Sequence, residues 1–186
     1  PTKRTTKVEP RHLREEELEK VLVMTTASLP WLTGTSVNAL MRCAELVRTG
    51  HDVVLFLPWA EPEDQKKVFP KLFESLAELA SYVRSWCAER RLDCPRIAFY
   101  DSIYHAPHHS LYPMGETLEL VEDDKLVTYP RGERGWKPDL IVLEEPEHLN
   151  WYAYRRDAGW RALCPVVGVV HTNYAGYAKT EELPGL

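Results

Sequence analysis

Several signatures of common binding sites are missing from this sequence. Its four cysteines, Cys43, Cys87, Cys94 and Cys164, are scattered and no two form a C-x-x-C pair, which argues against a zinc or thiol redox site. We interpret them as small core residues of a protein in a reducing compartment. No apolar run of the sequence approaches the roughly 20 residues of a membrane span, and no signal peptide is evident.

Basic residues are also too few for one class of partner. The chain has 23 basic and 28 acidic residues, a net charge of −5, whereas a nucleic-acid-binding domain normally presents a basic face. We therefore expect no nucleic-acid partner. A local basic patch at a membrane surface is still compatible with this charge.

Alternating strands and helices fill most of the chain, of which 44% is apolar. Apolar residues at helical spacing predict helices over 37–47, capped by Ser36 or Thr35, and over 71–91. The pattern predicts a single doubly wound, mostly parallel α/β domain of Rossmann type over 20–186, after a polar extension of 1–19. Continuous β-branched runs predict its buried parallel strands at 20–26, 52–57 (ended by Pro58), 96–100, 138–146 and 165–173, with a short hairpin around 125–129.

Ligands of such sheets bind beyond the carboxyl ends of the strands, near the switch in strand order. Three polar and aromatic segments follow predicted strands there. They are TASLPWLTG (26–34), EEPEHLNWY (144–152) and HTNY (171–174). Their common location at one edge makes this edge the candidate site.

Single residues in these segments allow two interpretations each. Gly34 is not part of a G-x-G-x-x-G fingerprint; it either lets helix amides approach a phosphate or sugar, or it is a turn glycine. Trp31 either stacks on a sugar or acyl chain, or covers the sheet edge. His171 either hydrogen-bonds a substrate hydroxyl or is a capped structural histidine.

Charged and histidine-rich groups are similarly open. Glu144, Glu145 and Glu147 suit acid–base work or sugar binding, or are solvated. The histidines of the segment 105–109 match no standard zinc spacing, so we expect no metal. Basic residues among aromatic ones suit an anionic lipid surface or a solvated helix face; these are Arg155, Arg156 and Arg161 among Trp151, Tyr152, Tyr154 and Trp160.

Three sequence blocks, 25–40 (TTASLPWLTGTSVNAL), 144–152 and 166–174 (VVGVVHTNY), occur in an order and spacing that resemble a known family. They are similar to the N-terminal half of plant and algal digalactosyldiacylglycerol synthases. These are retaining GT-B-fold glycosyltransferases that move galactose from UDP-galactose to monogalactosyldiacylglycerol. The resemblance spans about residues 20 to 180.

The resemblance implies roles for particular residues. The loop Thr33–Gly34–Thr35 would face the donor phosphates, and His171 would be the catalytic residue that contacts the transferred sugar. No cofactor is implied beyond UDP-galactose as the donor substrate. The partner would be a galactolipid or membrane surface, and the location a plastid, peripheral to a membrane. The acceptor or lipid side would be formed by Trp31, Glu147, His148, Asn150, Trp151, Asn173 and Tyr174.

One departure from the family leaves two hypotheses open. A GT-B enzyme has a second Rossmann domain, which carries an E-x7-E motif. In this sequence the E-x7-E spacing occurs from Glu9 to Glu17, before the first predicted strand and thus in a different context. The chain is then expected to be the acceptor-side half of a galactosyltransferase. The alternative is a non-catalytic relic of that half, acting as a structural or lipid-contacting subunit of a plastid membrane complex such as a photosynthetic one.

Overall fold

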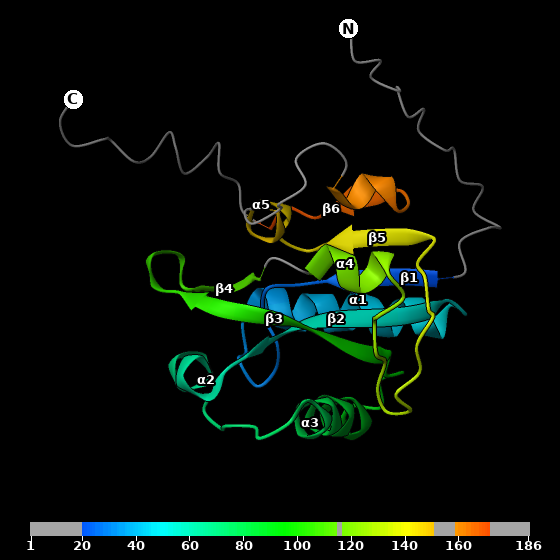
Figure 1. The fold of residues 1–186 in the computed structure, drawn as a ribbon. Helices are drawn as coiled ribbons and strands as arrows, with labels where there is room; N and C mark the ends of the chain where they lie inside the picture. Colours follow the sequence, from blue (N-terminus) through cyan, green and yellow to red (C-terminus); the bar gives the residue numbers. More distant parts are fainter. Residues whose placement is uncertain (1–19, 115–116, 151–158, 172–186) are drawn as a thin grey trace, which may run out of the picture.

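The computed structural model describes residues 20–114, 117–150 and 159–171. Six strands form one sheet in the order β4-β3-β2-β1-β5-β6, and only β4 runs antiparallel to its neighbour within this sheet. The Rossmann-like α/β class predicted from the sequence is confirmed. In chain order (Figure 1), the elements are β1 (Lys20–Met24), α1 (Gly34–Arg48), β2 (Asp52–Ala60), α2 (Pro62–Val68), α3 (Leu76–Glu89), β3 (Arg96–His105), β4 (Ser110–Pro113), α4 (Thr117–Glu122), β5 (Leu140–Leu143), α5 (Pro146–Leu149) and β6 (Val166–Gly168), with 3-10 turns at Ala106–His108 and Gly159–Ala162.

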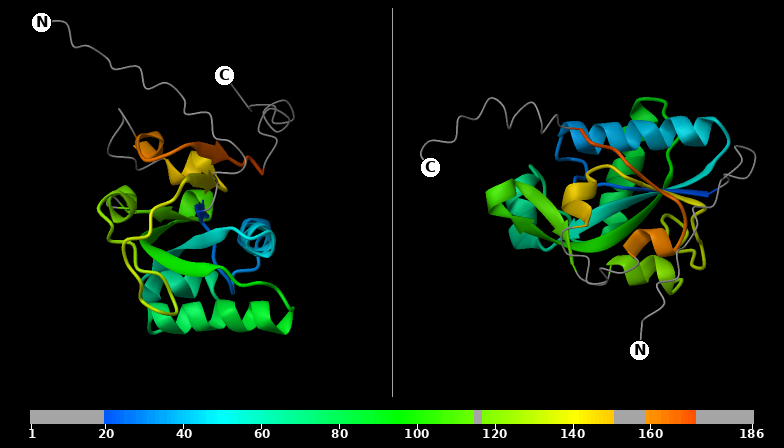
Figure 2. Two further views of the ribbon diagram at one scale, coloured as in Figure 1. Left: turned by 90° about the vertical axis from the view of Figure 1, so that its right-hand side faces the viewer. Right: turned by 90° about the horizontal axis from the view of Figure 1, so that it is seen from above.

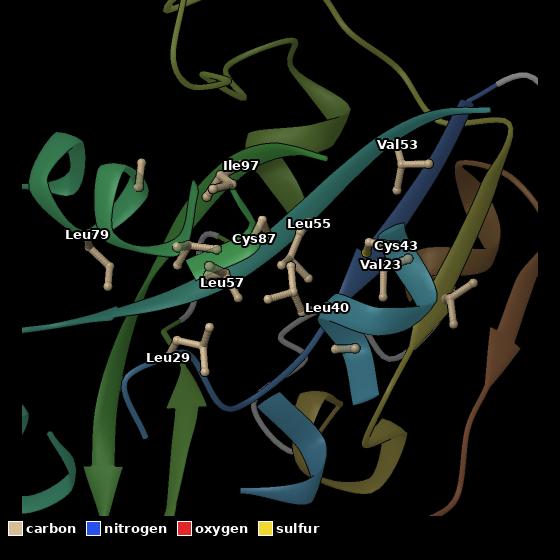
Figure 3. Close-up of a cluster of buried hydrophobic side chains, with 14 of the residues drawn as sticks. Val23, Leu29, Leu40, Cys43, Val53, Leu55, Leu57, Leu79, Cys87 and Ile97 are labelled. Atoms are coloured by element: carbon tan, nitrogen blue, oxygen red, sulfur yellow. The ribbon is translucent and has the colours of Figure 1, made fainter. Parts of the chain in front are cut away.

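Helices cover both faces of the sheet (Figure 2). Successive strand residues point to opposite faces, so each apolar strand contributes to two cores. One core joins α1 and α3 to the sheet (Figure 3), and it includes Val23, Leu40, Cys43, Leu55, Leu79, Cys87 and Ile97. The other joins α4, α5 and the 159–162 turn to the opposite face, and it includes Met24, Phe56, Tyr100, Val121, Leu143, Leu149 and Trp160.

The second and third strands are longer than expected. Pro58 was predicted to end β2, but the strand continues to Ala60. β1 pairs with β2 only as far as Met24 opposite Phe56, and the Phe56 carbonyl accepts the last bond on that side from Thr25, at 3.3 Å. Pro58 therefore lies where the β1 side of β2 has no partner strand, and its missing N–H costs no ladder hydrogen bond.

The hairpin is also in a different place. It is formed by β3 and β4, with Ser102 opposite Pro113 and His105 opposite Ser110. The segment 125–129, where the hairpin was expected, has only isolated bridges through Thr128 and Tyr129.

Both long helices begin at residues other than those expected. Thr33, rather than Thr35 or Ser36, caps α1: its Oγ1 accepts from the Ser36 backbone N–H at 3.2 Å, and the Ser36 hydroxyl faces the Thr33 N–H in a capping box. Ser75 caps α3, so this helix starts at Leu76 instead of residue 71. Of the apolar positions assigned to α1, Leu40 is buried, whereas Met41 is 43% exposed.

Candidate functional site

The switch in strand order lies between the parallel strands β1 and β5 (Figure 1). From β1 the chain winds outward to β2 and β3, and it then crosses to β5 and β6 on the other side. The connections leaving β1 and β5 therefore diverge, which opens the crevice used for ligands in doubly wound sheets. Thr25 and Thr26 follow β1 here, and Glu144 and Glu145 follow β5.

Glu144 joins three parts of the chain at this point. Its backbone N–H donates to the Met24 carbonyl at 2.9 Å, which continues the β1–β5 pairing. Its side chain is fully buried and accepts from Arg42 Nε of α1 at 2.6 Å. The other carboxylate oxygen lies 2.8 Å from Nε2 of His171, which follows β6. A carboxylate held this way fixes the orientation of the imidazole ring, and Nδ1 is then the ring nitrogen that can contact a substrate hydroxyl.

Glu145 points away from Glu144, as adjacent residues of an extended chain do. The Thr26 hydroxyl donates a short hydrogen bond to Glu145 Oε2, and the His148 ring lies 3.9 Å from Oε1. Burial first and the nearby charge of Glu147 second raise the pKa of Glu145 to about 7, and a backbone hydrogen bond from Thr26 opposes the shift. A carboxyl group with this pKa can take up or release a proton near neutral pH.

An aromatic and histidine cluster borders Glu145 on the β4 side. His148 of α5 stacks parallel to His108, with ring centroids 6.0 Å apart, and meets the Tyr112 ring edge-on at 5.3 Å. His108 Nδ1 forms a short hydrogen bond with the Tyr112 hydroxyl, and Ser110 Oγ lies 3.5 Å from His148 Nδ1. Burial lowers the pKa of His148, although the charge of Glu147 opposes this. The cluster ties the β3–β4 hairpin to α5.

The predicted donor-facing loop lies at the same edge of the sheet. The Thr33 hydroxyl is engaged in the helix cap and also lies 3.0 Å from the Thr35 hydroxyl. Gly34 is the first residue of α1, and a Cβ added there would meet only Asn38 Nδ2, at 4.0 Å. Its φ is not positive, so the backbone conformation does not require glycine, and the space above it is open. Trp31 is half-buried and packs against the core that contains α1, which agrees with a cover over the sheet edge.

Besides Trp31, the predicted acceptor-side residues divide into three groups. Glu147 and His148 lie on α5 beside Glu145. Asn150 ends α5, where its side-chain amide donates to the Pro146 carbonyl at 2.7 Å. The remaining three, Trp151, Asn173 and Tyr174, lie outside the described residues.

The lipid-facing interpretation of the basic and aromatic segment needs one correction. Trp160 is buried, with 6% of its surface exposed, in the core on the α4 face, so it is not available to a lipid surface. Arg161 beside it is exposed. Arg155, Arg156, Tyr152 and Tyr154 lie outside the described residues.

Residues 20–114, 117–150 and 159–171 contain neither a metal-binding cluster nor a membrane-spanning helix. Within these ranges no three His, Cys, Asp or Glu side chains are placed to hold a metal ion. No helix in the same ranges is long and apolar enough to cross a membrane.

Arg42 and Thr26 are the site residues that sequence reasoning missed. Thr26 stood inside the loop already selected, but nothing in the sequence paired its hydroxyl with Glu145. Arg42 is a charged residue next to the buried apolar positions of α1. Its position was the one sign in the sequence of an acidic partner, because a cation at the border of a buried helix face needs an anion. The partner, Glu144, is 102 residues away in the chain.

The strand order defines a Rossmann-like α/β domain. At its switch point, Glu144, Glu145, His171 and Arg42 form a polar candidate site. No family model matches the chain. The chain is, however, similar to digalactosyldiacylglycerol synthases of plants. It is 38% identical over 173 residues to digalactosyldiacylglycerol synthase 1, chloroplastic, of Arabidopsis thaliana, and this match covers 90% of the chain and 20% of the relative.

Two soybean (Glycine max) relatives give the same result. Digalactosyldiacylglycerol synthase 1, chloroplastic, is 37% identical over 181 residues, which cover 92% of the chain and 21% of the relative. Digalactosyldiacylglycerol synthase 2, chloroplastic, is 36% identical over 173 residues, which cover 90% and 34%. The chain therefore spans about a fifth to a third of the length of these relatives, and it is similar to one part of these digalactosyldiacylglycerol synthases.

Proposed function

We propose that the chain forms the acceptor-side half of a galactosyltransferase cleft, which transfers galactose from UDP-galactose to monogalactosyldiacylglycerol in a plastid, at a membrane surface. The observation that carries this proposal is the coincidence of two findings. The similarity to chloroplastic digalactosyldiacylglycerol synthases covers about nine-tenths of the chain, and the polar cluster lies at the switch point where a doubly wound sheet binds its ligand.

In this proposal each part of the edge has a distinct task. The amino end of α1, with the open space at Gly34, faces the diphosphate of the donor, where backbone amides and the helix dipole favour negative charge. His171 hydrogen-bonds a hydroxyl of the transferred galactose through Nδ1, while Glu144 holds the ring through Nε2. Glu147, His148 and Asn150 line the acceptor side. The diphosphate leaves with its charge balanced by fixed dipoles rather than by water.

A chimeric synthase tests the role of His171. In the chimera, this chain replaces the matched region of Arabidopsis synthase 1, and galactose transfer to monogalactosyldiacylglycerol vesicles is measured. We expect His171→Ala to lower kcat by about tenfold to a hundredfold, because a contact to the reacting sugar is lost. His51→Ala, just before β2 at the opposite end of the sheet, is the control and should leave kcat unchanged. Equal losses in both variants, or no loss in either, would contradict the catalytic role.

Gly34→Val tests the donor-facing loop in the same chimera. Since φ at Gly34 is not positive and the space above it is open, we expect the fold to tolerate valine. The side chain would occupy the approach of the diphosphate, so the KM for UDP-galactose should rise by at least about tenfold, with little change in Tm. Leu32→Val is the control in the same loop. An unchanged KM in Gly34→Val would reduce Gly34 to an ordinary helix-start residue.

The second candidate is a non-catalytic, lipid-contacting subunit of a plastid membrane complex. It is favoured by apolar side chains exposed at this same edge: Leu32 after β1 is 71% exposed and Val170 after β6 is 60% exposed. Both could insert into an apolar surface without a closed cleft. Two results together would favour this function over catalysis. The chain would bind galactolipid vesicles, more weakly in Leu32→Ser and Val170→Ser, and the chimera would be folded but inactive.

A further inference from the structure

Glu145 is a largely buried carboxyl group that does not cap the helix it precedes. It occupies the N-cap position of α5, yet its side chain makes no capping hydrogen bond there. Its side chain is 15% exposed, and its partners are the Thr26 hydroxyl and the His148 ring. Glu144 beside it is paired with Arg42 at 2.6 Å. A buried carboxylate without a strong cationic partner destabilises a fold, and such groups are concentrated at functional sites.

The position of Glu145 is between the two sides of the candidate site. Glu144, which lies 2.8 Å from the His171 ring, precedes it in the chain, and α5 with His148 follows it. Thr26, from the loop after β1, donates to Oε2 of Glu145. The 3.9 Å between Oε1 and His148 Nδ1 is too long for a hydrogen bond. Oε1 can therefore accept a hydrogen bond from a ligand that lies between His171 and α5.

We propose that Glu145 is the general base of the galactosyl transfer and accepts the proton of the acceptor hydroxyl. This inference rests on the proposed function. The hydroxyl oxygen of the acceptor lipid bonds to C1 of galactose, and the bond from C1 to the diphosphate oxygen breaks, with its electron pair leaving on UDP. The hydroxyl proton moves to Oε1 of Glu145, which afterwards releases it to water. A positioned base typically contributes about 10²- to 10⁴-fold to the rate of such a step.

The surroundings of Glu145 suit this task. Burial first and the charge of Glu147 second raise its pKa to about 7, which makes the ionised form a stronger base than an exposed carboxylate. Because a base acts in its ionised form, transfer should accelerate as the pH rises through about 7 and level off above it. The titratable groups that face Glu145 are Glu144, Glu147 and His148 on its own segment, Tyr100 of β3, and His108, which stacks on His148.

The pH profile of kcat/KM in the chimeric synthase tests the role. We expect Glu145→Gln to lower kcat/KM at least about a hundredfold at pH 8 and to remove the rise near pH 7, because glutamine cannot take up the proton. Glu145→Asp should keep the rise at an intermediate rate. Glu63→Gln, at an 82% exposed glutamate of α2, is the control and should leave the profile unchanged. Added formate should restore part of the activity of Glu145→Ala, which a purely structural role would not allow.

His171→Ala separates this role from that of the neighbouring histidine. It should lower the rate but keep the rise near pH 7. A rise that disappears in His171→Ala and persists in Glu145→Gln would overturn the base assignment. So would a Glu145→Gln variant of near-wild-type rate, and in that case the proposed function would still stand. A folded wild-type chimera without any transfer would overturn the proposed function, and the base assignment with it. Urea unfolding at pH 8.5 checks the fold, since Glu145→Gln should be at least as resistant as the wild type.

Discussion

Replacing Arg42 with alanine is expected to lower the free energy of unfolding by about 3 kcal/mol. The variant leaves the carboxylate of Glu144 fully buried with one partner instead of two, since the 2.6 Å contact to Arg42 is lost while the contact to His171 remains. A buried charge that loses a partner typically costs about 3 to 5 kcal/mol, and the lower end applies here because His171 is retained.

The same helix offers a matched control. Arg48 of α1 also pairs with a glutamate, Glu45, at 2.5 Å, but both side chains are more than half exposed. Arg48→Ala should therefore cost less than about 1 kcal/mol. Urea unfolding followed by circular dichroism measures both variants. Equal losses in Arg42→Ala and Arg48→Ala would mean that the buried position of Glu144 adds nothing to the pair.

Replacing Glu145 with glutamine is expected to stabilise the fold at pH 8.5 and to leave it unchanged at pH 4. The folded-state pKa of Glu145 is raised from 4.5 to about 7 by burial first and by the charge of Glu147 second. The folded protein therefore holds a proton that the unfolded chain has released between these two values, and stability falls as pH rises through them. The rise from 4.5 to about 7 corresponds to a loss of about 3 kcal/mol once both states are ionised.

Parallel urea titrations between pH 4 and pH 8.5 measure this effect as the difference between variant and wild type, which removes the contribution of other titrating groups. Glutamine keeps an acceptor for the Thr26 hydroxyl but carries no charge. Glu147→Gln is the second variant, and it should reduce the loss without abolishing it, because burial remains. A difference curve that is flat across this range would show that Glu145 is ionised without cost in the folded protein.

Much of the fold follows from local sequence, since buried parallel strands read as continuous apolar runs. All five predicted strands are present, and the segments that leave three of them meet at one edge, as expected for a doubly wound sheet. The ends of the elements were less accurate. Pro58 predicts a strand end, because a proline within a central strand removes a ladder hydrogen bond. Whether β1 still lies beside β2 at Pro58 depends on the strand lengths, which no local pattern specifies.

The contacts of the candidate site were largely beyond the sequence. His171 and the carboxylates could be selected because they follow strands. Their pairings could not, because Glu144 bonds to Arg42 and His171 across separations of 102 and 27 residues, and Glu145 faces Thr26 rather than its own neighbour. The register of the strand decides which face of the sheet each of the two adjacent glutamates points to. The sequence alone therefore could not show that Glu144, and not Glu145, contacts Arg42 and His171.

The unequal lengths of the strands give the ligand edge a stepped profile. β1 stops opposite Phe56 and β5 stops opposite Met24, but β2 continues four residues further, to Ala60, and is accompanied there by β3 (Figure 1). At about 3.3 Å per residue, this extension rises roughly 13 Å above the floor of the crevice. Within the described residues, a molecule resting on Glu144 and Thr26 would therefore meet a tall wall at β2 and β3 and only a low step at β6, which ends at Gly168 opposite the last residue of β5 and is followed by His171.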